Sequence, residues 1–314
     1  MKVKLILGSL VSLAAIVGAT LGTGYGISVA VVFRVVLPVI GLFLGSMLCG
    51  PGLGILADAM GPCDTLSPKR RESALGAIAF ARRALLLIAS LGLIMNLVSM
   101  FKSLEDRNAV WINLALAMGP ALVALFIHAA VLEPLVIRLR RSSSKAASSS
   151  SETERPTNTR GRAGILIRQI PGFCLMLASL IALNPDLISG IFLHLPAILI
   201  AVFIPIGLLI AAGDGPSMWR SLGTVFSSSS STEELKTAQE LFGSLTLAFK
   251  RAMALGAALG FVFLVKDWLD ITRYGPTLTL ALISLFWGMI GILFISLPLE
   301  ALAAQRACRE VRPC

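Results

Sequence analysis

Long apolar runs, bounded by charged or polar residues, dominate the pattern along this chain of 314 residues. Each run approaches the ~18–25 residues that a helix needs to cross ~30 Å of hydrocarbon. We find eight of them, at Leu5–Leu21, Ile27–Cys49, Ala84–Phe101, Val110–Val136, Ile165–Leu183, Ile188–Ala212, Ala252–Leu269 and Pro276–Leu299. The pattern predicts an all-α, polytopic membrane protein with about eight transmembrane helices, the first run being retained and not cleaved as a signal peptide.

The overall composition agrees with this pattern. Hydrophobic residues make up 56% of the chain, charged residues 14%, and the mean hydropathy is +0.86. A single aqueous core of this chain length cannot bury that much apolar surface. The lipid bilayer is therefore the expected partner of most of the chain.

The distribution of basic residues predicts the orientation. Short cytoplasmic loops collect Lys and Arg, whereas exported loops avoid them. An N-inside arrangement leaves few basic residues outside or near the outer ends of helices, namely Arg34, Lys102, Arg107, Lys266 and Arg273. Both termini are then cytoplasmic, and the net charge of +10 reflects topology and contact with anionic lipid. No aromatic-interleaved basic stripe indicates nucleic acid as a partner.

A Ser-rich, basic segment lies near the midpoint of the chain, with four apolar runs before it and four after it. Its sequence from Arg141 to Arg162, RSSSKAASSSSETERPTNTRGR, has no apolar periodicity and is typical of a linker. We therefore predict a membrane half at 1–138, a cytoplasmic linker at 139–164, and a second membrane half with a cytoplasmic tail at 165–314.

The two halves carry matching marks in the same order. The matched pairs are Leu37-Pro38 with Leu195-Pro196, Arg82-Arg83 with Lys250-Arg251, Leu91-Gly92 with Leu259-Gly260, and Pro134-Leu135 with Pro298-Leu299. Each half crosses the membrane an even number of times, so both copies share one orientation. The marks predict a parallel 4+4 repeat and not an inverted one.

Both cytoplasmic loops predict short helices. Ser67-Pro68 is a cap followed by Pro at the first helical position, and Ser231 with Glu234 has the spacing of a capping box. Apolar residues then recur at helical spacing. Such a helix lies along the lipid headgroups or offers a small docking surface, and we favour the headgroup location.

Several segments carry a resemblance to a known family. LGLIMNLVSMFKSLEDRNAV and LALAMGPALVALFIHAAVLEPL are similar to the third and fourth helices of the MotA/TolQ/ExbB proton-channel family, closest to the flagellar stator subunit MotA. FLHLPAILIAVFIPIGLLIAA resembles its second helix, GTVFSSSSSTEELKTAQELF its following cytoplasmic segment and LILGSLVSLAAIVGATLG its first helix. Each half thus resembles one four-helix subunit.

The resemblance implies a multi-pass subunit of the bacterial inner membrane that forms homo-oligomers around a single-pass MotB/ExbD-like partner. In that family the partner's membrane carboxylate carries the ion. This chain departs from the pattern in two ways. Its cytoplasmic loops have only roughly 35 residues per half, and the early part of each last helix is poor in hydroxyl groups. We therefore expect no conventional flagellar torque generation.

Few residues within the runs are candidates for an ion path. His128 either relays protons or bonds a neighbouring helix carbonyl, and Glu133 is either solvated or paired with Arg138. Pro120 either opens a carbonyl to a pore or shapes a packed bundle. The candidate ion-path or packing residues are His128, Glu133, Pro120, Ser284, Gly92 and Gly260.

Motifs for catalysis or for metal and cofactor binding are missing from the sequence. There is no HExxH, GxSxG or Walker loop, and the five cysteines show no CxxC spacing. We expect no enzyme activity, no cofactor and no metal. Three functions remain, in this order: a MotA-like energy-transducing or channel subunit, a non-conducting membrane scaffold derived from one, and a small-solute transporter.

Overall fold

The computed structural model describes residues 29–60, 68–102, 104, 106–133, 135–136, 139, 162–184, 192, 195–211, 215–227, 230–266 and 271–310. Within these ranges all regular elements are helical, which confirms the predicted all-α fold for this part of the chain. The first predicted run, Leu5–Leu21, and His194 lie outside the described residues. So does the predicted linker, 139–164, except for Leu139 and the residues from Arg162, where a helix already begins.

Ten α-helices and two π-helical stretches make up the described residues. They are α2 (Val29–Cys49), α3 (Leu53–Met60), α4 (Pro68–Lys102), α5 (Arg107–Ile127), η2 (His128–Leu132), α7 (Arg162–Leu183), α8 (Leu195–Ala211), α9 (Gly215–Phe226), α10 (Thr232–Lys266), α11 (Ile271–Ile290), η4 (Gly291–Ser296) and α12 (Leu297–Glu310). The stretches η2 and η4 are π-helices that interrupt otherwise α-helical segments.

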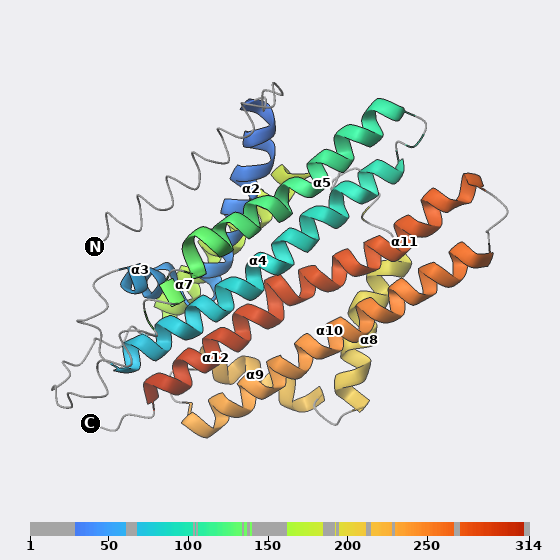
Figure 1. Ribbon diagram of the computed structural model, residues 1–314. Helices are drawn as coiled ribbons and strands as arrows, with labels where there is room; N and C mark the ends of the chain where they lie inside the picture. Colours follow the sequence, from blue (N-terminus) through green and yellow to red (C-terminus); the bar gives the residue numbers. More distant parts are fainter. Residues whose placement is uncertain are drawn as a thin grey trace.

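The long helices form a row in the order α5, α4, α11 with α12, and α10 (Figure 1). We call α4 with α5 and η2 the first hairpin, and α10 with α11, η4 and α12 the second hairpin. α4 ends and α5 begins at the same end of the molecule at which α10 ends and α11 begins (Figure 1). The two hairpins therefore run parallel, and α4 packs directly against α11 where they meet.

The predicted short cytoplasmic helices are continuous with the long helices that follow them. α4 runs from Pro68 to Lys102 and α10 from Thr232 to Lys266, without interruption. The apolar face at the start of α10 is buried, including Leu235, Ala238 and Phe242, and α10 packs there against α9 and α12. Neighbouring helices of the same chain therefore cover this face, while the location of the helix relative to the lipid headgroups stays a prediction.

α2 and α7 make the closest helix–helix contact between the first half and the second. A Cβ added at Gly45 would lie 2.5 Å from Cγ of Met176 and 2.8 Å from the backbone oxygen of Gly172. A Cβ added at Gly41 would come closer still to the side chain of Ser179. Glycine at these two positions, four residues apart in α2, allows the two backbones to approach.

In the sixth predicted run, Ile188–Ala212, the residues that the structure describes are Phe192 and 195–211. Phe192 lies in a bend, and α8 begins at Leu195. Proline lacks a backbone N–H and fits the first helical turn, where that donor has no intrahelical acceptor. Pro196 therefore suits a helix start, whereas the matched Pro38 lies inside α2.

Two helical stretches in the described part of the chain have the length and apolar composition needed to cross a bilayer. They are Arg70–Phe101 and Ala281–Ala307. Shorter apolar helices are Val35–Cys49, Ile112–Ile127, Gln169–Leu183 and Ala197–Leu208. Membrane association is the coarse property to which these helices point.

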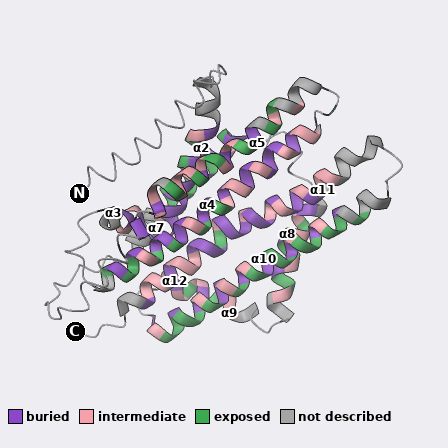
Figure 2. Cartoon of the chain, viewed as in Figure 1, coloured by how far each residue is buried: buried purple, intermediate pink, exposed green. Residues whose placement is uncertain are grey.

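Burial is uneven across the row of long helices. α4 carries the largest share of the buried residues, whereas α5 and α10 expose apolar side chains along the two edges (Figure 2). Leu122 and Leu125 on α5 are 62% and 63% exposed, and Val262 on α10 is 62% exposed. The core of the molecule therefore lies where the two hairpins meet.

Candidate functional site

Three ionisable side chains meet on the first hairpin. Nη2 of Arg82, on α4, donates to Oε1 of Glu133 at 2.7 Å. Nε2 of His128 lies 3.9 Å from the same oxygen. The three side chains are between 32% and 42% exposed, so they are partly screened from solvent. We call Arg82, Glu133 and His128 the charged cluster.

The π-helical stretch η2 brings His128 and Glu133 together. The backbone N–H of Glu133 donates to the carbonyl of His128, five residues earlier. In an α-helix of 3.6 residues per turn, positions five apart point in clearly different directions. The wider π turn rotates them closer to one face, so that His128 lies near the Glu133 oxygen that accepts from Arg82 on the neighbouring helix.

Sequence reasoning found two members of this cluster and missed the third. It left Glu133 solvated or paired with Arg138, whereas the structure pairs it with Arg82. Arg138 lies outside the described residues. The available signal was the spacing of the basic pair Arg82-Arg83, which places one arginine on the face of α4 toward α5, but a π-helix is not visible in the apolar pattern.

The second hairpin has the same backbone feature at the matched place. In η4 the N–H of Leu297 donates to the carbonyl of Ile292, again five residues earlier. In the sequence, a proline follows one residue after each of these donors, as Pro134 and Pro298. Proline removes one N–H and crowds the carbonyl four residues before it, which favours a local change of helix type.

The side chains at the matched places differ completely. Ile292 stands where the first hairpin has His128, Leu297 where it has Glu133, and Lys250 where it has Arg82. Leu297 is buried and Lys250 is exposed. The charged cluster thus has no counterpart in the second hairpin.

The predicted glycine positions both lie in the contact between the helices of their own hairpin. A Cβ at Gly92 would lie 2.5 Å from Cγ of Pro120, and a Cβ at Gly260 would lie 2.5 Å from Cβ of Ala281. Pro120 is buried within α5. Its ring packs against α4 at this point, as the packing alternative for Pro120 predicts.

Ser284, the predicted hydroxyl of the second hairpin, is also a packing residue. It is 1% exposed, and its Cβ lies 2.5 Å from the position that a Cβ on Gly256 would occupy. The backbone of α10 therefore approaches Ser284 closely. In this conformation its hydroxyl lies inside the second hairpin and away from the charged cluster on the first.

A buried amide joins α7 to the first hairpin. Nδ2 of Asn184, directly after α7, donates to the carbonyl of Met95 at 3.2 Å and to Oγ of Ser99 at 2.9 Å. Asn96 bonds the carbonyl of Gly92 nearby. The sequence analysis missed these residues, because an Asn that follows an apolar run also reads as an ordinary helix end.

Arg306 joins the last helix, α12, to the end of α9. Its guanidinium donates to the carbonyls of Thr224, Val225 and Ser227 at the end of α9. The last carbonyls of a helix have no intrahelical donors and carry partial negative charge, so a guanidinium is a suitable partner. α12 and α9 are held together there, within the half that also contains η4.

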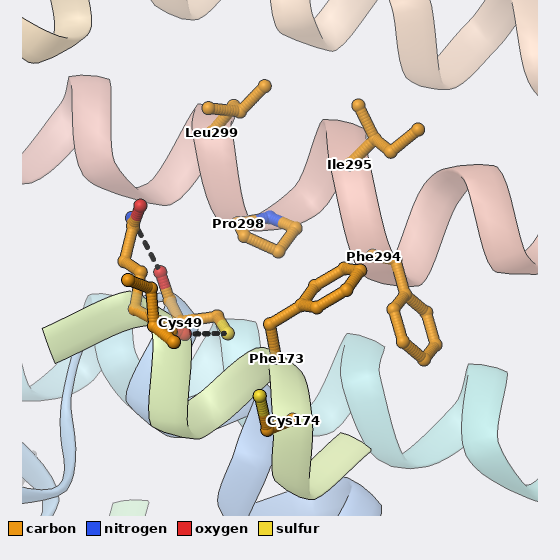
Figure 3. A pocket seen from close by; sticks show the side chains of 9 residues that line it. Cys49, Phe173, Cys174, Phe294, Ile295, Pro298 and Leu299 are labelled. Carbon is orange, nitrogen blue, oxygen red and sulfur yellow. Dashed lines mark hydrogen bonds between the residues drawn. The ribbon is translucent and has the colours of Figure 1, made fainter. Parts of the chain in front are cut away.

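An apolar cavity of about 310 Å³ lies between α7 and the η4–α12 segment (Figure 3). Phe173 and Phe294 meet edge to face across it, with ring centroids 5.5 Å apart. At its rim Sγ of Cys49 donates to the carbonyl of Gln169, and the amide of Gln169 donates to the carbonyl of Cys49. The lining offers apolar contact but no arrangement suited to acid–base or metal chemistry. None of the described residues forms a group of three or more metal ligands.

Comparisons with protein-family models, with curated proteins and with solved structures found no match.

Proposed function

We propose that this chain is a MotA-like integral subunit of an ion-driven complex in the bacterial inner membrane, built from two parallel four-helix repeats. The observation that carries the architecture is the pair of π-helices. The bonds Glu133 to His128 and Leu297 to Ile292 occupy matched places in two parallel hairpins. A duplicated four-helix unit accounts for this match and for the paired sequence marks.

The membrane location draws support from the surface of the row of long helices. Large apolar side chains are exposed along α5, α8 and α10, where water would be an unfavourable solvent. Hydrocarbon or a neighbouring membrane helix suits these faces. The start of α4, with Lys69, Arg70 and Arg71, and the end of α12, with Arg306 and Arg309, lie together at one end of the molecule, as a shared cytoplasmic side requires (Figure 1).

The ion-carrying carboxylate comes from a partner in this proposal. Among the described residues no Asp or Glu lies near the centre of a long apolar helix, and Glu133 is already paired with Arg82. A lone carboxylate in hydrocarbon is costly unless a counter-group or water compensates it. A single-pass MotB/ExbD-like helix is the partner that the family resemblance suggests.

A conventional rotor contact is not part of the proposal. The cytoplasmic part consists of the helix extensions of α4, α10 and α12 with α3 and α9, and the two loops have only roughly 35 residues each. The chain therefore acts within the membrane and does not drive a flagellar rotor by itself.

Proton flux in liposomes tests this function. We expect little flux from the purified chain alone and a clear increase when a co-purifying single-pass partner is included. Substituting the partner's membrane Asp with Asn should abolish the increase. Robust flux from the chain alone would refute the partner-carboxylate proposal, and motility restored in cells lacking their stator subunit would refute the claim about the rotor.

A non-conducting scaffold is the second candidate. The observations that favour it are the buried position of Ser284 and the ion pair that neutralises Glu133. This function predicts stable assembly without flux, with or without a partner. The same liposome experiment separates the two candidates.

Topology is tested independently of flux. With both termini and the linker cytoplasmic, a cysteine introduced as Ser148→Cys in a cysteine-free chain should resist an impermeant thiol reagent in intact cells and react after permeabilisation. Reaction in intact cells would contradict the N-inside, eight-helix arrangement.

A further inference from the structure

The edges of the row of long helices carry two apolar stripes. We call Leu114, Met118, Leu122 and Leu125 the α5 stripe, and Leu247, Arg251, Leu255, Leu259 and Val262 the α10 stripe. Their spacing of three and four residues places each stripe on one helix face. All nine side chains are exposed, and the two stripes lie at opposite edges of the row (Figure 2).

Two residues matched to the α10 stripe, Leu91 and Ile94, are covered, whereas Arg83, which is matched to Arg251, is exposed. Leu91 and Ile94 on α4 correspond to Leu259 and Val262 on α10, by the same shift that matches Arg83 with Arg251. Leu91 is 0% exposed and Ile94 is 6% exposed. α4 is covered because α11 packs on it where the two hairpins meet.

Two residues matched to the α5 stripe are covered as well, while Leu278 and Leu282 are half-buried. Phe286 and Met289 on α11 correspond to Leu122 and Leu125 on α5, by the same shift that matches Pro134 with Pro298. Phe286 is 0% exposed and Met289 is 9% exposed. The parts of the two stripes at Leu259–Val262 and Leu122–Leu125 are therefore the counterparts of buried residues on α4 and α11, the two helices that pack together where the hairpins meet.

We propose that the α10 stripe of one copy of this chain packs against the α5 stripe of a second copy, in the way that α4 packs against α11 within one chain. The proposal rests on the two-repeat membrane architecture proposed above. The contact between the hairpins then recurs between chains, and each row of long helices continues into the next.

The internal contact also fixes the register between copies. Arg83 and Glu300 face each other at 3.4 Å across α4 and α12. Ile94 lies about three helical turns after Arg83 on α4, and Met289 lies about three turns before Glu300, on α11. Because the two helices run in opposite directions, both residues lie on the same side of this ion pair. Their counterparts Val262 and Leu125 should meet between copies.

The two stripes differ from each other, so the contact is heterologous. Each copy that uses its α10 stripe on one side keeps its α5 stripe for the next copy. Such assembly proceeds until the rotation between copies closes it. Bare lipid against both stripes is the competing occupant, and it predicts a monomer.

Cysteine cross-linking in membranes tests the contact. In a chain whose native cysteines are replaced by serine, the double variant Val262→Cys with Leu125→Cys should give a ladder of cross-linked products on oxidation. Either single variant alone should give no cross-linked product, because in the proposed contact Val262 of one copy meets Leu125 of the next and never a second Val262. Co-expressing the two single variants with different tags should give mixed dimers only.

The matched control is Leu37→Cys combined with Val262→Cys. Leu37 is 62% exposed on α2 and belongs to neither stripe. Cross-linking no stronger than this control, or dimers from a single variant, would overturn the proposed contact. Cross-linking without proton flux would support the contact and count against the ion-driven function. Proton flux from a chain that stays monomeric would support the function and contradict the contact.

A second measurement replaces the same two residues with tryptophan, whose large side chain should disturb the contact. Leu125→Trp or Val262→Trp should shift the assembly measured by native mass determination toward monomer, while Leu37→Trp should leave it unchanged. An unchanged distribution in properly folded Val262→Trp and Leu125→Trp chains would contradict the contact.

Discussion

The two hairpins share a backbone plan and differ in the chemistry placed on it. Both have a π-helix at the matched place, and both bring a glycine of the first helix against the second helix. Only the first hairpin carries charge there, as Arg82, Glu133 and His128. In the second, Leu297 is buried and Thr246 bonds Ser296 near the same level.

This difference teaches that the two hairpins share their packing and not their polar side chains. A π-helix is retained in both hairpins because helix geometry and proline depend on the backbone. A charged cluster depends on three side chains together and is easily lost from one copy. The ionisable side chains that the structure brings together at this level therefore lie in the first hairpin, whereas Leu297 at the matched place in the second is buried and apolar.

The largest expected effect comes from placing the charge of the first hairpin in the second. Leu297→Glu puts a carboxylate at a position that is 3% exposed, where Arg83 in the same hollow already pairs with Glu300. We expect the chain to lose about 3 kcal/mol or more of stability, because an unpaired buried charge is costly. The thermal midpoint in detergent measures this loss. The control Leu297→Met keeps the volume and should cost less than about 1.5 kcal/mol.

The next largest loss of stability is expected from replacing the two matched glycines, Gly92 and Gly260, with alanine. Gly260→Ala meets the backbone of Ala281, whereas Gly92→Ala meets the ring of Pro120. Overpacking of this kind costs about 1–3 kcal/mol, and the backbone contact should make Gly260→Ala the worse of the two. Thermal unfolding of both variants tests this order, and equal midpoints would contradict it.

Matched controls for these glycines exist on the same helices. A Cβ at Gly76 on α4 or at Gly243 on α10 meets nothing within 4 Å. Gly76→Ala and Gly243→Ala should raise stability by about 0.5–1 kcal/mol, because alanine favours the helix.

Removing the charge from the first hairpin should have a smaller effect. Glu133→Leu leaves Arg82 without its partner, and Nε of Arg82 is already buried without a hydrogen bond. Because the pair is about a third exposed, we expect a loss of only about 1 kcal/mol. Adding Arg82→Lys and His128→Ile gives the first hairpin the residues found at the matched places of the second. These two changes should restore most of the lost stability. A double-mutant cycle on the thermal midpoint checks this, and no recovery would contradict the comparison.

The smallest effect concerns the starts of α4 and α10. Ser231 and Glu234 exchange hydrogen bonds across the start of α10, at 2.9 Å and 3.3 Å, while α4 starts with Pro68. Ser231→Ala should cost about 1 kcal/mol. Hydrogen exchange should then speed up over the first turn of α10 and stay unchanged at the start of α4. A change spread over both helices would contradict a local cap.

Much of the helix arrangement was predictable from the sequence. The apolar runs located α2, α7 and the long helices, because burial requires apolar side chains along a helix and the bilayer sets the length of the apolar stretch. The capping box at Ser231 is confirmed, since capping depends on local residues only. The start of α8 was placed too early, because Pro196 acts on backbone geometry that an apolar average does not register.

The candidate site was less predictable. His128 and Glu133 stood out as ionisable residues in an apolar run, but their common partner Arg82 is 51 residues from Glu133 in the chain. The shared oxygen depends on a π turn and on the pairing of two helices. Asn184 was missed for the same reason, since its acceptors lie 85 and 89 residues away. Long-range pairing of this kind is a property of the fold and not of any short segment.

The contact between α2 and α7 has a consequence for biosynthesis. Cys49 and Gln169, which bond each other, are 120 residues apart. At ~5–20 residues per second of translation, the glycine face of α2 waits roughly 6–24 s for its partner helix to be made. During that interval a membrane insertase or chaperone, or the α7 of a chain finished earlier, has access to the face. The order of synthesis thus gives this chain an opportunity to exchange helices between copies before its own second half arrives.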